Sequence, residues 1–171
     1  MEFVFETDYN QRAMTAMAKG LRKTVRKKHS RRSHIFGWIV LAVALLLSWI
    51  SDGNAGTGTL VTWAAAVVMV FTMVFEDMIN GYVARKRMLP GTAHAKVIFT
   101  EGGYRSETAA GNTEWKYENI AAMAELPRYF VFLFGNNHAQ VYDKRSLTGG
   151  TAEAFRAFME AQTGKTVEIL K

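Results

Sequence analysis

Two long apolar runs stand out in the pattern of hydrophobic and polar positions. They extend from Ile35 to Ile50 and from Thr59 to Phe75, and their inner parts are apolar on every helical face. Such helices are typical of a membrane, and about 20 residues cross the ~30 Å of hydrocarbon in a bilayer. Both runs reach this length once their polar flanks lie at the interfaces. The pattern therefore predicts a two-helix transmembrane hairpin over residues 35–78, with spans at 35–51 and 59–76.

The charges that flank the two runs predict their orientation. Residues 19–34 carry eight Lys or Arg side chains and no acidic one, whereas the loop from Ser51 to Gly58 carries one acid and no base. Because Lys and Arg near the ends of spans mark the cytoplasmic side, both termini are predicted to be cytoplasmic. The segment that precedes Ile35 is too long and too charged for the start of a cleaved signal peptide, so the first span is expected to be retained.

Before the first span, residues 1–34 are predicted to form a strand and a long basic helix. Met1 to Glu6 alternates between polar and apolar side chains, as a strand does, and Thr7 and Asp8 offer an N-cap to the helix that follows. Within that helix, apolar residues recur every three or four positions, at Met14, Met17, Leu21 and Val25.

This amphipathic helix is expected to extend from Tyr9 to about Ser33 and to run into the first span. Gly20 and Gly37 are the candidate breaks. The helix would either lie on the bilayer surface or project into the cytoplasm beside a helical extension of the second span, from Glu76 to Leu89. The pattern leaves both arrangements open.

After Pro90-Gly91 the period of the apolar positions changes from 3.6 to 2, which predicts strands. Turn residues separate six expected strands: 95–100, 104–108, 113–117, 120–126, 129–134 and 138–142. A helix is expected from Ala152 to about Thr163, between an N-cap at Thr151 and a terminating Gly164. Residues 79–171 would thus form a helical stalk and a small antiparallel-sheet domain closed by a C-terminal helix.

The predicted fold class is therefore α+β, in a membrane protein whose cytoplasmic domain is similar to a pleckstrin-homology (PH-like) half barrel. A domain of roughly 80 residues is marginal alone. It is expected to dock on the strand Met1 to Glu6 or on the helical stalk.

Composition narrows the function classes. The net charge is +6, yet from Pro90 onward nine basic residues face nine acidic ones, so the excess lies beside the spans and no nucleic-acid-binding face is expected. The absence of cysteine excludes disulfides, thiol redox chemistry and cysteine zinc sites. Four histidines show no metal-ligand spacing: His29, His34, His94 and His138. We expect no catalytic residue, no metal and no cofactor.

Two groups of cations are candidates for contact with lipid headgroups or a protein partner. They are Lys27, Lys28, Arg31 and Arg32 before the first span, and Lys144 and Arg145 at the end of a strand. The alternative is that they only set topology or are solvated. The hairpin also brings Glu76 and Asp77 to the rim of Arg31 and Arg32. An ion pair there, such as Arg31 or Arg32 with Glu76, is one hypothesis, and solvated carboxylates are the other.

Several segments of the chain carry a family resemblance: Thr7-Asp8-Tyr9, Tyr104-Arg105-Ser106-Glu107, Trp115 followed by Ile120, Tyr129 to Leu133, and Val141 to Leu147. With the two spans between them, they make the chain resemble the YcxB-like family of bacterial membrane proteins over nearly its whole length. That family typically has Pro where Asp143 stands, followed by the basic pair that Lys144 and Arg145 match. The resemblance implies a bacterial plasma-membrane protein and brings no established activity or catalytic residue with it.

The expected function is that of a membrane-tethered, non-enzymatic binding or regulatory module. Two spans would hold a small domain at the bilayer surface, where the local concentration of partners is raised. The expected partners are membrane lipids and a further membrane or cytoplasmic protein. An immunity-type protein that protects against a toxin, or an enzyme that acts on lipid or peptide, are the alternatives. The small residues Ala64 to Ala66 would allow close helix packing within the hairpin or in a homo-oligomer.

Overall fold

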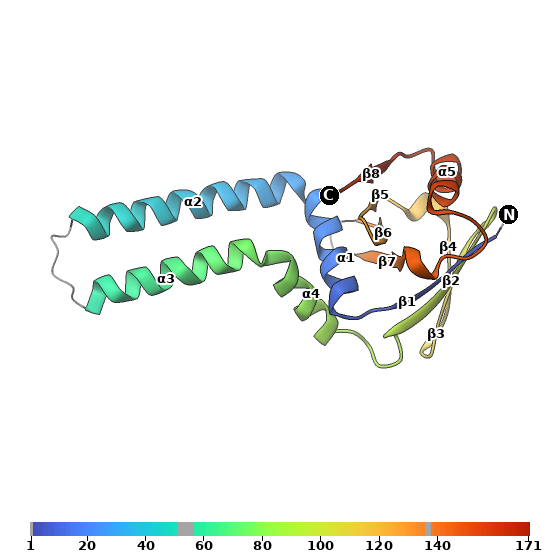
Figure 1. The fold of residues 1–171 in the computed structure, drawn as a ribbon, viewed down its shortest axis with the longest axis horizontal. Helices are drawn as coiled ribbons and strands as arrows, with labels where there is room; N and C mark the ends of the chain where they lie inside the picture. The colour runs from blue at the N-terminus through green and yellow to red at the C-terminus, as the bar shows by residue number, and fades with distance from the viewer. Residues whose placement is uncertain (1, 51–56, 136–137) are drawn as a thin grey trace.

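A pair of long apolar helices extends from a domain of two β-sheets, and two shorter helices join these parts (Figure 1). The structure is a computed structural model that describes residues 2–50, 57–135 and 138–171. In these ranges the chain is α+β, with five α-helices and two four-stranded sheets. The predicted fold class is confirmed at this level.

The long helices are α2 (Lys27–Ile50) and α3 (Thr57–Val74), which run side by side (Figure 1). Most of their apolar side chains are exposed, and Trp49 reaches 84%. Of the described helices, α2 is long and apolar enough to cross a membrane. The number rises to two if α3 and α4 (Glu76–Lys86) form one span, although they are bent by 75° where they meet. Most of the predicted connecting loop, at positions 51–56, lies outside the described residues.

The expectation of one continuous helix into the first span is wrong. Helix α1 (Gln11–Lys23) ends before a turn at residues 24–26, and its N-cap is Asn10, whose side chain accepts a hydrogen bond from the Ala13 amide. Thr7 and Asp8 belong instead to the preceding strand. Helix α1 lies on a sheet, so closely that a Cβ at Gly20 would meet Val131 Cγ1 at 2.7 Å, and the chain bends after it.

Helix α4 packs along α1, so the predicted extension of the second span does not continue straight into the cytoplasm. It also ends at Lys86, before the expected Leu89. A Cβ at Gly81 would come within 2.7 Å of the Thr15 backbone nitrogen, which shows how closely the two helices cross. Together α1 and α4 form a short layer between the long helices and the sheets (Figure 1).

The first sheet is antiparallel, with its strands in the order β1-β2-β3-β4. These strands are β1 (Phe3–Asp8), β2 (His94–Thr100), β3 (Gly103–Thr108) and β4 (Gly111–Trp115). Phe5 lies opposite Val97, so the N-terminal strand completes a sheet of the C-terminal region. The expected docking of this strand on the domain is confirmed.

The second sheet has the order β7-β6-β5-β8. Its strands are β5 (Ala122–Glu125), β6 (Tyr129–Leu133), β7 (Ala139–Asp143) and β8 (Val167–Ile169). Strand β8 was not expected, and it pairs with β5 in parallel. Helix α5 (Ala152–Thr163) has the predicted bounds and caps, with Thr151 accepting from the Ala154 amide and Gly164 at a φ of 64°.

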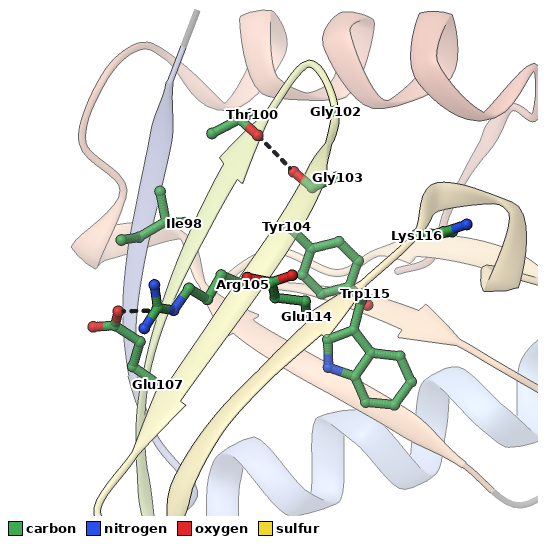
Figure 2. Close-up of a pocket in the computed structure, with 10 residues that line it drawn as sticks. All are labelled: Ile98, Thr100, Gly102, Gly103, Tyr104, Arg105, Glu107, Glu114, Trp115 and Lys116. Carbon is green, nitrogen blue, oxygen red and sulfur yellow. Dashed lines mark hydrogen bonds and ion pairs between the residues drawn. The ribbon is translucent and has the colours of Figure 1, made fainter.

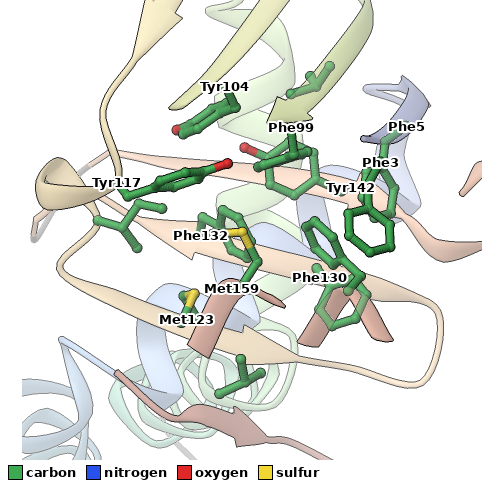
Figure 3. Packing of buried hydrophobic residues seen from close by; sticks show 14 of the residues in the cluster. Phe3, Phe5, Phe99, Tyr104, Tyr117, Met123, Phe130, Phe132, Tyr142 and Met159 are labelled. Carbon is green, nitrogen blue, oxygen red and sulfur yellow. The ribbon is translucent and has the colours of Figure 1, made fainter. Parts of the chain in front are cut away.

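Aromatic side chains from both sheets and α5 fill the core (Figure 3). Phe155 of α5 is fully buried, with its ring 4.7 Å from that of Phe5 and 4.9 Å from that of Phe99 between centroids. Strand β6 is buried on both faces, because Phe130 and Phe132 point into this core while Val131 and Leu133 pack under α1. The layer of α1 and α4 is therefore fixed to the domain.

Candidate functional site

The elbow where α1 turns into α2 lies beside the end of β8 (Figure 1). Residues of these elements line a basic cavity. Its volume is about 430 Å³. We call its lining on the two helices the basic elbow, which comprises Arg22, Lys23, Lys27, Ser30, Arg31 and His34. Residues 168–171 form the opposite wall. The turn at residues 24–26 creates the site, because it brings cations of α1 next to cations of α2.

Positive charge predominates in this cavity. Lys27 lies 3.9 Å from Glu168, and both side chains are largely exposed, so this ion pair is weak. Within the described part of the chain, Lys23 and Arg31 have no acidic partner. Lys27 and Arg31 are four residues apart and share one face of α2, where like charges repel. An anion in the cavity would relieve this repulsion.

Arg22 is different, because its guanidinium is held by acidic residues of α4. It donates two hydrogen bonds of 2.6 Å to the Asp77 carboxylate and lies 3.7 Å from Glu76. The hydrogen bonds to Asp77 raise the pKa of Arg22 above its usual value. Arg22 thus fixes the elbow to α4 and contributes little free charge to the cavity.

The predicted ion pair between Arg32 and Glu76 is wrong. The second partner of Glu76 is His34, whose Nε2 lies 2.7 Å from the carboxylate. Two residues along an α-helix correspond to a rotation of about 200°. Since His34 faces Glu76, Arg32 points away from it and is exposed. The acidic residues at this rim are paired, as one of the two hypotheses held, but with other partners.

The structure brings together only part of the predicted group before the first span. Lys27 and Arg31 line the cavity, whereas Lys28 and Arg32 lie on other faces of α2 and are exposed. Sequence reasoning missed Lys23 of α1 and the wall formed by β8. A signal for Lys23 was present in the basic run, but its position depends on the turn that follows it.

The second predicted group, Lys144 and Arg145, divides between two roles. Lys144 Nζ lies 2.9 Å from Glu125 Oε1, and Arg156 Nε lies 2.6 Å from the other oxygen of this buried carboxylate. Burial alone would raise the pKa of Glu125, but the hydrogen bonds from Arg156 and Lys144 outweigh it and lower the pKa. Lys144 therefore stabilises the fold and is not free to contact lipid. Arg145 is 68% exposed, and a contact there stays a prediction.

Asp143 stabilises the turn before residues 144–146, at the position where the family named above typically has Pro. Its carboxylate accepts a hydrogen bond from the Arg145 amide at 3.1 Å and forms an ion pair with Arg128 at 2.6 Å. Burial raises the pKa of Asp143, but the hydrogen bond from Arg128 and those from Arg145 lower it by more. The carboxylate caps the short helix of residues 144–146 that follows.

A larger hollow of about 640 Å³ lies on the first sheet, where β3 begins and β4 ends (Figure 2). Its charged lining is balanced, with Arg105 3.3 Å from Glu107. Trp115 lies at the edge of the core, only partly buried, and its ring stacks on Tyr104 with 6.3 Å between centroids. The balanced charge of this hollow favours no class of ligand.

No group of three or more His, Asp or Glu side chains in the described ranges is arranged to hold a metal ion. The basic elbow is instead composed of donors. Lysine and arginine side chains donate hydrogen bonds and carry positive charge, which suits carboxylate or phosphate groups. The arrangement can therefore bind an anion.

Comparison with known proteins finds a similarity to one family over part of the chain. No curated protein matches the sequence. The family model described as YcxB-like protein matches residues 99–159, from the end of β2 into α5. This range contains Trp115 and the strand Tyr129–Leu133, which carried the resemblance, whereas the long helices and the basic elbow lie outside it. Residues 99–159 of this chain are therefore similar to YcxB-like proteins.

Proposed function

We propose that this protein is a membrane-anchored, non-enzymatic binding module of the bacterial plasma membrane. In this arrangement α2 and α3 cross the bilayer as a hairpin, and both termini and the sheet domain lie in the cytoplasm. The observation that carries the proposal is the apolar surface of the two long helices. Soluble proteins rarely expose contiguous apolar patches larger than a few hundred Å², whereas Leu47 and Val67 are 61% and 66% exposed among equally apolar neighbours.

The lengths of the helices support two spans. The 18 residues of α3 measure about 27 Å at a rise of ~1.5 Å per residue, close to the ~30 Å of hydrocarbon. Helix α4 then turns by 75° and carries Glu76 and Asp77 in its first turn. We infer that the span ends at this bend and that α4 lies along the cytoplasmic surface.

The exposed face of α4 fits that position. Met78 and Tyr82 are about half exposed, and Lys86 lies over the Tyr82 ring at 4.9 Å from its centroid. An aromatic ring combined with a cation is common at the level of lipid headgroups. The rows of basic residues near both helix ends support a cytoplasmic location for this side of the hairpin.

The two spans would hold the sheet domain in a defined orientation rather than merely keep it near the membrane. Helix α1 packs on β6 and β7 and crosses α4 at Gly81, so the connection between the domain and the spans is rigid. The two sheets and α5 are compatible with a PH-like half barrel to which β8 has been added. The module would thus present fixed surfaces, including the basic elbow, at a fixed position relative to the bilayer.

The absence of cysteine allows a direct topology experiment. Single substitutions Asn54→Cys, between the spans, and Asn112→Cys, exposed on β4, can be made in the full chain. We expect a membrane-impermeant maleimide to label the first variant in intact cells and the second only after lysis. Both should stay in the membrane pellet at alkaline pH. Extraction at alkaline pH, or labelling of Asn112→Cys in intact cells, would overturn the proposal; the unmodified chain is the control.

A further inference from the structure

We infer that the basic elbow binds the phosphate group of an anionic lipid headgroup in the cytoplasmic leaflet. This inference rests on the proposed membrane anchoring, and it assigns a ligand class to the cavity. The carrying observation is that cations from two helices converge on one hollow at the end of a predicted span.

The depth of the cavity matches the headgroup layer. Arg31 precedes the apolar start of α2 at Ile35 by four residues, which is about 6 Å along a helix axis. The polar layer on each side of a bilayer is roughly 5–7 Å thick. His34 lies at the boundary, where it contacts Glu76 at the end of the other long helix, so both helices leave the hydrocarbon at one level. Arg31 is therefore placed at the height of lipid phosphates.

The charge of the cavity selects an anion. Lys23, Lys27 and Arg31 line it from two helices, and Glu168 is the acidic side chain in its wall. Each Lys or Arg near an anionic surface contributes attraction, and arginine and lysine donate charge-assisted hydrogen bonds to phosphate oxygens. The hydrogen bonds from Arg22 to Asp77 fix the end of α1 to α4, so the cations of the elbow stay next to one another.

Size and polarity favour a lipid over a small soluble phosphate ester. A volume of about 430 Å³ lies within the range of ligand sites. The wall also includes Ile169, an apolar side chain that is 66% exposed. This apolar surface lies beside three cations. Such a combination suits a ligand whose phosphate group is linked through glycerol to an acyl chain. At this height, anionic lipids are also the most concentrated source of phosphate.

Native mass spectrometry of the full chain in neutral detergent tests this inference. The protein is titrated with phosphatidylglycerol, with phosphatidylcholine of the same acyl chains, and with soluble glycerol phosphate. We expect a first phosphatidylglycerol to bind more tightly than phosphatidylcholine. The double substitution Lys27→Gln and Arg31→Gln should weaken that binding about 30-fold, the equivalent of about 2 kcal/mol for two cations.

Lys28→Gln with Arg32→Gln is the matched control, since it removes the same charge from the same helix one residue further along. We expect it to weaken phosphatidylglycerol binding less than threefold. Equal losses in both double variants would reduce the effect to diffuse attraction and overturn the inference, as would equal binding of the two lipids by the unmodified chain. Displacement of the lipid by glycerol phosphate at comparable concentration would refute the claim that the bound phosphate group belongs to a lipid.

Two further measurements separate failure of this inference from failure of the proposed function. Alkaline extraction of the unmodified chain tests the anchoring alone, whatever its lipid preference. Thermal unfolding of both double variants shows whether they remain folded, and exposed Gln side chains on α2 should leave the midpoint within about 2 °C. A folded, membrane-retained protein without the expected difference between the doubles refutes the headgroup site and leaves the anchor intact.

Discussion

The sheet domain and the helical hairpin contain similar apolar side chains, but they place them in opposite surroundings. In the domain, Phe5 and Phe155 are fully buried among other aromatic rings. In the hairpin, Leu47 and Trp49 are 61% and 84% exposed. The folding free energy of the domain therefore depends on contacts within the chain, whereas the stability of the hairpin depends on the medium that surrounds it.

The two regions meet in a polar joint. Arg22 of α1 binds Asp77 of α4, and His34 of α2 contacts Glu76 at the same rim. The joint lies between an apolar core that excludes water and an apolar surface that is exposed. Substitutions in the domain and in the hairpin should consequently be detected by different measurements.

The largest expected effect comes from truncating a core ring. Phe155→Ala should lower the free energy of unfolding by about 4 kcal/mol, because it leaves a cavity among the aromatic rings around it. Urea denaturation of the full chain in detergent, followed by circular dichroism, measures this loss. Leu47→Ala is the control in the hairpin and should change unfolding of the domain by less than about 0.5 kcal/mol. Equal effects of both would contradict the distinction between the regions.

The second comparison uses two side chains with the same exposure. Val67 in α3 and Ile169 in β8 are both 66% exposed. A charge near the centre of a span costs about 3 kcal/mol during insertion, so Val67→Arg should reduce the membrane-inserted fraction measured by alkaline extraction. Ile169→Arg should leave that fraction unchanged. If Val67→Arg inserted as well as its counterpart, α3 would not face hydrocarbon.

Elements determined by nearby residues could be predicted from the sequence, whereas elements determined by distant residues could not. A half-buried strand such as β2 leaves a period of two in the sequence, and turn residues bound the strands from β2 to β7, so these strands were located closely. Helix α5 was predicted with its observed ends, because Thr151 and Gly164 each determine a cap. Strand β8 was missed, since so short a strand carries little periodicity and its parallel partner β5 lies far earlier in the chain, before β6, β7 and α5.

The bends around the elbow could not be predicted from neighbouring residues. The turn at residues 24–26 contains neither Gly nor Pro, and the helix before it packs through Gly20 on Val131, which lies in the distant strand β6. For the same reason the site was only half predicted. Lys27 and Arg31 share a helix face by spacing alone, whereas Lys23 joins them only after the bend.

A third prediction concerns the ionic contacts that stabilise the sheet domain. Lys144 and Arg156 share the buried carboxylate of Glu125. Removing that charged partner with Glu125→Gln should lower the free energy of unfolding by about 2 kcal/mol at neutral pH. Urea denaturation measures this loss. Glu118→Gln, at an exposed position, is the control and should leave the free energy of unfolding nearly unchanged.

The pH dependence of that loss has a defined sign. The pKa values of Glu125 and Asp143 are lowered in the folded state. Their stabilisation is therefore fully present above the unfolded-state pKa values of about 4 and is lost as the pH falls through the folded values. The unmodified chain should lose stability on acidification, and its advantage over Glu125→Gln should shrink. An advantage that grew at low pH would contradict the ion pairs.

The smallest effects distinguish what glycine does in each region. Gly164 has a φ of 64° with no atom within 4 Å of an added Cβ, so Gly164→Ala should cost about 1 kcal/mol through backbone strain alone. Gly37 in α2 has helical backbone, and its added Cβ would meet Met73 Sδ at 3.0 Å, at the flexible end of a side chain. Gly37→Ala should therefore be neutral or slightly stabilising, since alanine favours helix and the methionine can move. Thermal unfolding of both variants in detergent measures the difference. A loss at Gly37 as large as that at Gly164 would show that the two long helices are packed as tightly against each other as the core of the sheet domain.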